Sequence, residues 1–165
     1  MNGELHSPFI YFTMFNFKKK PPQFFTQDEQ DAIVAAIRNT EKRTSGEVRV
    51  FVESKCRFMN AVDRAEEVFN QLQMQQTKNR NGVLVYVAIK DRQYALYADK
   101  GIYEKTGTNY WLAQASAIIK HFNKGDYSAG ITAAIEEIGN ALSSHFPYDA
   151  ATDKNELPDD IVFGK

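Results

Sequence analysis

An almost unbroken run of apolar residues, from Val83 to Ile89, constrains the fold of this chain more than any other segment. Such a run is typical of a strand that is buried on both faces, at the centre of a layered α/β sheet. Only Asp91 and Arg92 form the turn before a second strand, which is expected over Gln93 to Ala98. A connection this short forces the second strand to run antiparallel to the first.

A third strand is expected over Glu47 to Glu53, where valines alternate with other residues. A helix expected from about Asn60 to Gln76 connects it to the central strand, so these two strands should be parallel with a right-handed crossover. Three further helices are expected: one from the capping box at Thr26–Glu29, one over about Asn109 to Asn123 with Leu112 facing inward, and one from Asp126 to about Ser144. The order α-β-α-β-β-α-α predicts an α/β fold, a Rossmann-like three-layer α/β/α sandwich with a mixed sheet.

A chain of 165 residues fits one domain, which we place at residues 24–147. Residues 1–23 are expected to form a flexible N-terminal arm that contains Lys18 to Lys20, and Met14 could be the native start. Residues 148–165 are expected to form a polar, mobile tail, from which Leu157 and Ile161 to Phe163 could dock back. Asp99 to Gly101 are expected only to close the strand before them.

Charge and cysteine content limit the classes of partner. The formal net charge is −1, from 20 basic and 21 acidic residues, which argues against nucleic acid as a partner. No signal peptide and no transmembrane segment is recognisable. The single cysteine, Cys56, excludes an intramolecular disulfide and favours a reducing compartment, so we expect a cytoplasmic protein.

Polar residues gather at one edge of the expected sheet, where the parallel strands begin and the antiparallel strand ends. Carboxylates, carboxamides and backbone carbonyls from three loops should meet there, and hard cations prefer such oxygen ligands. We therefore predict a calcium site, with magnesium less favoured, formed by Glu47, Asn79, Asn81 and Asp99. The alternative is conformational: asparagine is a common loop residue, Asp99 would only cap a turn, and Glu47 would only begin a strand.

The opposite edge carries the charged residues Lys55, Arg57 and Arg92, which could receive an anion at a helix start. Cys56 lies between two of these basic residues, which favour a thiolate. The alternatives are a solvated charged rim and a thiol without a role.

Four segments resemble the TPM-domain family, named after a thylakoid lumen protein, a photosystem II repair protein and a receptor modulator. They are Thr44–Val50, Asn79–Val87, Tyr97–Ile102 and Phe122–Tyr127. The resemblance covers about Phe24 to Phe146 and is greatest to short bacterial members that consist of this domain alone. It implies an α/β/α sandwich, an association with calcium, and, from one plant lumenal member, acid phosphatase activity. Many relatives have a signal peptide and a transmembrane helix, and this sequence shows neither.

Two hypotheses of function follow. The first is a non-enzymatic module that binds calcium and an unidentified protein partner. The second, which rests on the resemblance alone, is a weak metal-dependent acid phosphatase. The sequence assigns no catalytic residue, because Cys56 lacks a C-x5-R loop, no D-x-D motif occurs, and the three histidines lack zinc-ligand spacing. The sequence does not indicate an oligomeric state.

Overall fold

The computed structural model describes residues 10–14, 24–154 and 157–164, and these residues form a five-stranded mixed sheet. The strands lie in the order β1-β4-β3-β2-β5, with β2 parallel to β3 and β5, and β4 antiparallel to β3 and β1. The predicted mixed sheet is therefore confirmed. Their bounds are β1 Ile10–Met14, β2 Glu47–Glu53, β3 Gly82–Ala88, β4 Gln93–Ala98 and β5 Ile161–Phe163.

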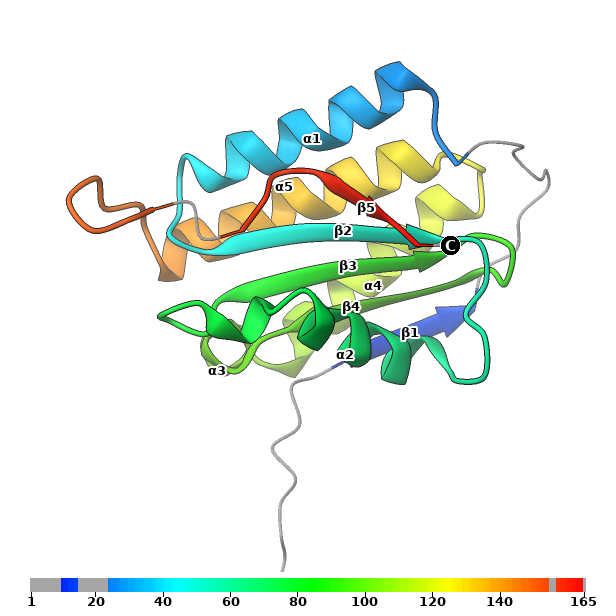
Figure 1. Ribbon diagram of the computed structural model, residues 1–165, viewed down its shortest axis with the longest axis horizontal. Coiled ribbons are helices and arrows are strands. Elements are labelled where there is room, and N and C mark those ends of the chain that lie inside the picture. The colour runs from blue at the N-terminus through cyan, green and yellow to red at the C-terminus, as the bar shows by residue number, and fades with distance from the viewer. Residues whose placement is uncertain (1–9, 15–23, 155–156, 165) are drawn as a thin grey trace, which may run out of the picture.

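Helices cover both faces of this sheet, as Figure 1 shows. One face packs against α1 (Gln27–Glu41), α4 (Thr108–Phe122) and α5 (Tyr127–His145), and the other packs against α2 (Ala61–Gln71). Because side chains alternate along a strand, Val50 faces the larger core under α1 and α5, while Phe51 faces the smaller core under α2. The three-layer arrangement is confirmed. The Rossmann-like comparison stays a prediction, since the sheet combines the parallel pairs β2–β3 and β2–β5 with the antiparallel pairs β3–β4 and β1–β4.

The capping residues at two helix starts act as the sequence predicts. The Thr26 hydroxyl accepts from the Glu29 backbone N–H at 3.2 Å, and the Glu29 carboxylate accepts from the Thr26 backbone N–H at 2.8 Å. Asn60 caps α2 by accepting from the Asp63 backbone N–H at 2.9 Å. The prediction that this helix continues to Gln76 is wrong. The chain leaves the helix and turns through a short 3-10 helix, Met74–Gln76, which places Met74 in the core.

The region after β4 also differs from the prediction. Residues 99–101 do not merely close the strand, because Asp99 caps an additional helix, α3 (Lys100–Thr106). The predicted order of elements therefore lacks α3 as well as the first and last strands. Leu112, which was expected to face inward, is half-exposed on α4, while the neighbouring Trp111 is fully buried.

Both terminal segments contribute to the sheet, so a domain limited to residues 24–147 is too short. Strand β1 lies within the predicted arm and pairs with β4, and β5 lies within the predicted tail and pairs with β2. Burial of Ile161 and an ion pair between Arg49 and Asp160, at 3.2 Å, hold β5 in place. The predicted basic arm at Lys18 to Lys20 lies outside the described residues. In the described part of the chain, every helix is too short or too polar to cross a bilayer.

Candidate functional site

The edge at which we predicted a cation site is formed by the expected three loops. Strands β2 and β3 begin there in register, with Glu47 opposite Gly82. Strand β4 ends there, and the backbone N–H of Asp99 donates to the Gly82 carbonyl at 2.9 Å. The topology therefore brings the loops together, but the four predicted ligands do not converge on one point.

Asp99 has a structural role at this edge. Its side chain is fully buried, and its two carboxylate oxygens accept from Arg80 Nε at 2.7 Å and Arg80 Nη2 at 2.8 Å. One of these oxygens also accepts from the Lys100 backbone N–H at 2.7 Å, which caps α3. A bidentate guanidinium already neutralises this carboxylate, so it does not offer a free ligand for a cation. Asp99 therefore acts as a capping residue, which is the alternative to a cation ligand that the sequence left open.

The two predicted carboxamides differ in burial. Asn79 is exposed, and its contribution is a backbone carbonyl that lies close to Gly101. Asn81 is fully buried, and its Nδ2 donates to Ser45 Oγ at 3.3 Å. Among the described residues, its Oδ1 has no hydrogen-bond partner. Asn81 is therefore a buried partner of Ser45, whereas Asn79 is a solvent-exposed loop residue.

Glu47, in contrast, lines a pocket of about 380 Å³ with three acidic residues that the sequence did not suggest, Glu41, Asp153 and Asp159. Glu41 comes from the end of α1, Glu47 from the start of β2, and Asp159 from the segment before β5. We call these three side chains the acidic pocket. The other lining residues are Arg38, Lys42, Thr44, Ser45, Gly46, Tyr148, Asp153 and Lys154.

The three carboxyl groups interact strongly enough to change protonation. Burial raises the pKa of Glu41 to about 10, and repulsion from Glu47 and Asp159 acts in the same direction. Both carboxyl oxygens of Glu41 are shielded from solvent. Glu41 is therefore a neutral acid at pH 7, able to donate a hydrogen bond to a neighbouring carboxylate.

The acidic pocket contains carboxyl oxygens of the kind that bind hard cations, but these oxygens are not arranged as a complete coordination sphere. Within the residues that the structure describes, no three His, Cys, Asp or Glu side chains are placed so that they could hold a metal ion. Basic side chains also line the pocket, and Arg38 Nε lies 3.8 Å from Asp159 Oδ2. The arrangement can accept a cation among the carboxyl groups, or an anion beside the basic groups.

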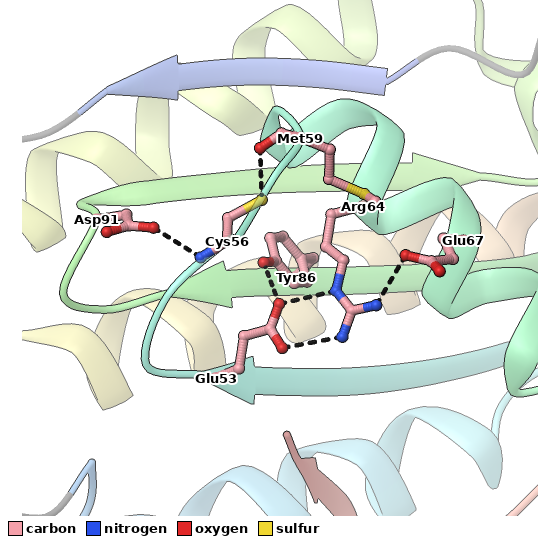
Figure 2. Close-up of polar contacts among 7 residues, drawn as sticks. All are labelled: Glu53, Cys56, Met59, Arg64, Glu67, Tyr86 and Asp91. Atoms are coloured by element: carbon pink, nitrogen blue, oxygen red, sulfur yellow. Dashed lines mark hydrogen bonds and ion pairs between the residues drawn. The ribbon is translucent and has the colours of Figure 1, made fainter. Parts of the chain in front are cut away.

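At the opposite edge of the sheet, a buried ion pair connects β2, β3 and α2 (Figure 2). Glu53 is 3% exposed and accepts from Arg64 Nε at 2.9 Å and Nη2 at 3.0 Å. The Tyr86 hydroxyl donates to the same carboxylate at 2.5 Å, and Arg64 Nη1 also reaches Glu67 at 2.8 Å. Because these charges are paired with one another, removing one partner would leave an uncompensated charge between α2 and the sheet.

Cys56 lies beside this cluster, and its surroundings favour the thiol over the thiolate that its basic neighbours in sequence could have stabilised. Its backbone N–H donates to Asp91 Oδ2 at 2.7 Å, and its thiol donates to the Met59 carbonyl at 3.1 Å. Burial raises the pKa of the thiol, and the nearby carboxylates of Glu53 and Asp91 raise it further. The basic neighbours in sequence do not offset these effects, so Cys56 is a protonated thiol with a structural role.

Comparison with known proteins supports the resemblance that the sequence suggests. The model of the TPM domain matches residues 19–141. The solved BA42 protein of the psychrophilic bacterium Bizionia argentinensis is 41% identical, with a TM-score of 0.81 over 88% of this chain and 99% of that chain. The N-terminal domain of cg2496 from Corynebacterium glutamicum is 13% identical, with a TM-score of 0.60 over 88% of this chain and 97% of that chain, and shows the fold alone. None of the curated proteins compared with this chain matches it.

Proposed function

Because this chain belongs to the TPM-domain family, we propose that it is a non-enzymatic module that binds a divalent cation, preferentially calcium, in the acidic pocket. The observation that carries this proposal is the meeting of three carboxyl groups from three separate segments in one pocket. Like charges in such a place repel one another, and either a proton or a cation relieves that repulsion. In the absence of a cation, the proton on Glu41 serves this purpose.

The residues of the pocket fit calcium better than magnesium. Glu47 and Asp159 would supply carboxylates, Glu41 would supply a third after losing its proton, and Ser45 would add a hydroxyl oxygen. Calcium accepts six to eight oxygens in flexible geometry, whereas magnesium requires a near-ideal octahedron. Since the described side chains do not form a finished site, binding requires them to close around the ion, which calcium tolerates. Bound calcium would neutralise the charge that the Glu41 proton neutralises in the free chain.

This site differs from the ligand set expected from the sequence. Glu47 remains in it, and Asn81 supports it through Ser45. Asp99 forms an ion pair with Arg80, and Asn79 is exposed to solvent. Neither residue belongs to the proposed site.

Calorimetric titration of the EDTA-treated full chain with calcium tests the proposal. We expect Glu47→Gln to weaken calcium binding by at least about tenfold, since a ligand carboxylate is lost. Glu104→Gln is the matched control, because it removes the same charge from an exposed residue of α3. Equal calcium affinity in Glu47→Gln and Glu104→Gln would exclude the acidic pocket.

A specific observation favours the second function, a weak metal-dependent phosphomonoester hydrolase. Arg38, Lys42 and Lys154 line the same pocket and could bind a phosphate beside the cation, whose charge would stabilise the phosphoryl group. Hydrolysis of p-nitrophenyl phosphate should then require calcium or magnesium and should fall in Lys42→Ala. Turnover that survives both EDTA and Glu47→Gln would reject this mechanism.

We also propose a cytoplasmic location, supported by the single cysteine, which excludes an internal disulfide. A protein partner remains part of the proposal, and the cation would order the pocket segments that such a partner contacts.

A further inference from the structure

The loop between β2 and α2 presents two apolar side chains to solvent. Phe58 is 102% exposed and Met59 is 38% exposed. The backbone of Phe58 is in the left-handed region, with φ of 66°, which is uncommon for a bulky residue. Single exposed apolar residues are ordinary, but here the loop conformation directs an aromatic ring entirely away from the protein.

Hydrogen bonds within this loop and to the turn between β3 and β4 fix its position. The Cys56 backbone N–H donates to the Asp91 carboxylate at 2.7 Å, and the thiol donates to the Met59 carbonyl at 3.1 Å (Figure 2). The Lys90 backbone N–H donates to the Ser54 carbonyl at 2.7 Å. The apolar residues are therefore displayed on an anchored loop, at the end of the sheet away from α3 (Figure 1).

Basic side chains surround the two apolar ones. The exposed basic residues of the loop and the neighbouring turn are Lys55, Arg57, Lys90 and Arg92. Two charged carboxylates lie close by: Asp91 accepts from the Cys56 backbone N–H, and Asp63 accepts from Asn60 Nδ2 at 2.9 Å, so the four basic residues outnumber them. The buried Glu53 is neutralised by Arg64. This end of the molecule therefore has a local excess of positive charge, although the whole chain has a net charge of −1.

We propose that this basic-aromatic tip, formed by Lys55, Arg57, Phe58, Met59, Lys90 and Arg92, docks the protein on anionic lipid bilayers. The positive charges complement the negative surface of such a bilayer, and Phe58 and Met59 enter at the level of the headgroups. A bilayer is the occupant that this arrangement fits, because one fully exposed aromatic ring projects from a basic surround whose charge complements an anionic surface. The tip lies at the opposite end of the sheet from the acidic pocket, so this proposal is independent of cation binding.

The expected affinity is modest and depends on salt. Each basic residue near an anionic surface strengthens binding by roughly fivefold, and insertion of Phe58 contributes about tenfold more. Because surface charges are screened by salt, binding should weaken strongly as ionic strength rises. The docking is thus reversible, of the strength associated with a single acyl anchor.

Co-sedimentation of the full chain with lipid vesicles tests the proposal. The vesicles contain phosphatidylcholine alone or phosphatidylcholine mixed with phosphatidylserine. The buffer contains EDTA, so that no cation bridges the acidic pocket to lipid. We expect binding to the mixed vesicles only, a loss of about tenfold in Phe58→Ser, and loss of binding when Lys55→Glu and Arg57→Glu are combined. Leu112→Ser is the control for an exposed apolar residue elsewhere. Lys78→Glu with Lys105→Glu makes the same change of net charge with exposed residues at the other end of the sheet.

Three results would overturn the proposal. The first is no binding of the parent chain to mixed vesicles at low salt. The second is equal weakening by the tip variants and by their controls, which would indicate a general effect of charge or hydrophobicity. The third is binding that persists in the tip variants but disappears when Lys18, Lys19 and Lys20 are changed to Glu, which would assign lipid binding to that segment. Amide spectra of each variant establish that the fold is retained.

Discussion

Replacing Glu41 by Gln should make the chain more stable at alkaline pH, because the native acidic pocket disfavours the charged form of this residue. Burial raises the pKa of Glu41 from 4.5 to about 10. Between these two values the folded chain keeps a proton that the unfolded chain has released. Stability contributed by this proton is complete below the lower value and is lost as the pH rises toward the higher one. Glutamine keeps a hydrogen-bond donor and cannot ionise.

The magnitude follows from the size of the shift. The loss for one such group cannot exceed about 1.4 kcal/mol per pH unit, which gives a ceiling of roughly 3.5 kcal/mol between about pH 5.5 and about pH 8. Glu41 is only partly buried as a residue, so solvent screening should reduce this to about 1–2 kcal/mol. In a chain of this size, that corresponds to a rise of roughly 2–8 °C in Tm for Glu41→Gln at the higher pH.

Thermal and urea unfolding in EDTA, followed by fluorescence of the buried Trp111, measures this difference. The parent chain and Glu41→Gln should have similar stability at the lower pH and should diverge as the pH rises. Glu104→Gln, on an exposed position of α3, should follow the parent throughout. Parallel pH profiles for the parent and Glu41→Gln would refute the reasoning, because they would show that Glu41 ionises as an ordinary carboxyl group in the folded chain.

Three further substitutions test how the two edges of the sheet are stabilised. Asp99→Asn should lower the free energy of unfolding by about 1–3 kcal/mol, because it breaks the pair between the buried Asp99 and the half-exposed Arg80. Calcium titration should show unchanged affinity, and a loss of affinity would return Asp99 to the cation site. Arg64→Leu should lower the free energy of unfolding, measured in urea, by about 3–5 kcal/mol, because Glu53 would remain buried without its partner. A loss below about 1 kcal/mol would contradict the assignment of this pair as buried. Gly101→Ala should cost about 1–3 kcal/mol, since its Cβ would lie 2.0 Å from a backbone carbonyl of the preceding loop, and a Tm equal to that of the parent would show that the loop moves freely.

The central part of the fold could be predicted because its signals are local. The apolar run of β3, the short turn after it and the alternation in β2 each indicate a strand without reference to the rest of the chain. The capping box at Thr26 likewise marks the start of α1. These elements, with one parallel crossover, are sufficient to predict a mixed sheet between layers of helices.

The outer strands and α3 could not be predicted because they depend on contacts between residues that are distant in the sequence. Strand β5 has three residues, and its formation depends on pairing with β2 and on the ion pair between Arg49 and Asp160. In the sequence the same segment is polar and acidic, which is also typical of a mobile tail. Helix α3 begins where Asp99 is positioned by Arg80, a contact that sequence spacing does not reveal.

In the candidate site, too, one residue could be predicted from the sequence and the others depend on contacts that form only in the folded chain. Topology placed Glu47 correctly at the edge where the loops meet. The partners of that residue come from the end of a helix and from the C-terminal segment, so only the folded chain brings Glu41 and Asp159 to it. One signal in the sequence could have suggested Glu41: a helix that ends shortly before a strand places its last acidic residue near the start of that strand.

The most direct test of cation binding is to map amide shifts by NMR while calcium is added to the EDTA-treated full chain. Binding in the acidic pocket predicts saturable shifts clustered on the lining residues, which include Glu41, Glu47 and Asp159, and their loss in Glu47→Gln. Saturable shifts centred on Arg80 and Asp99, or no shifts at millimolar calcium, would contradict the proposed site.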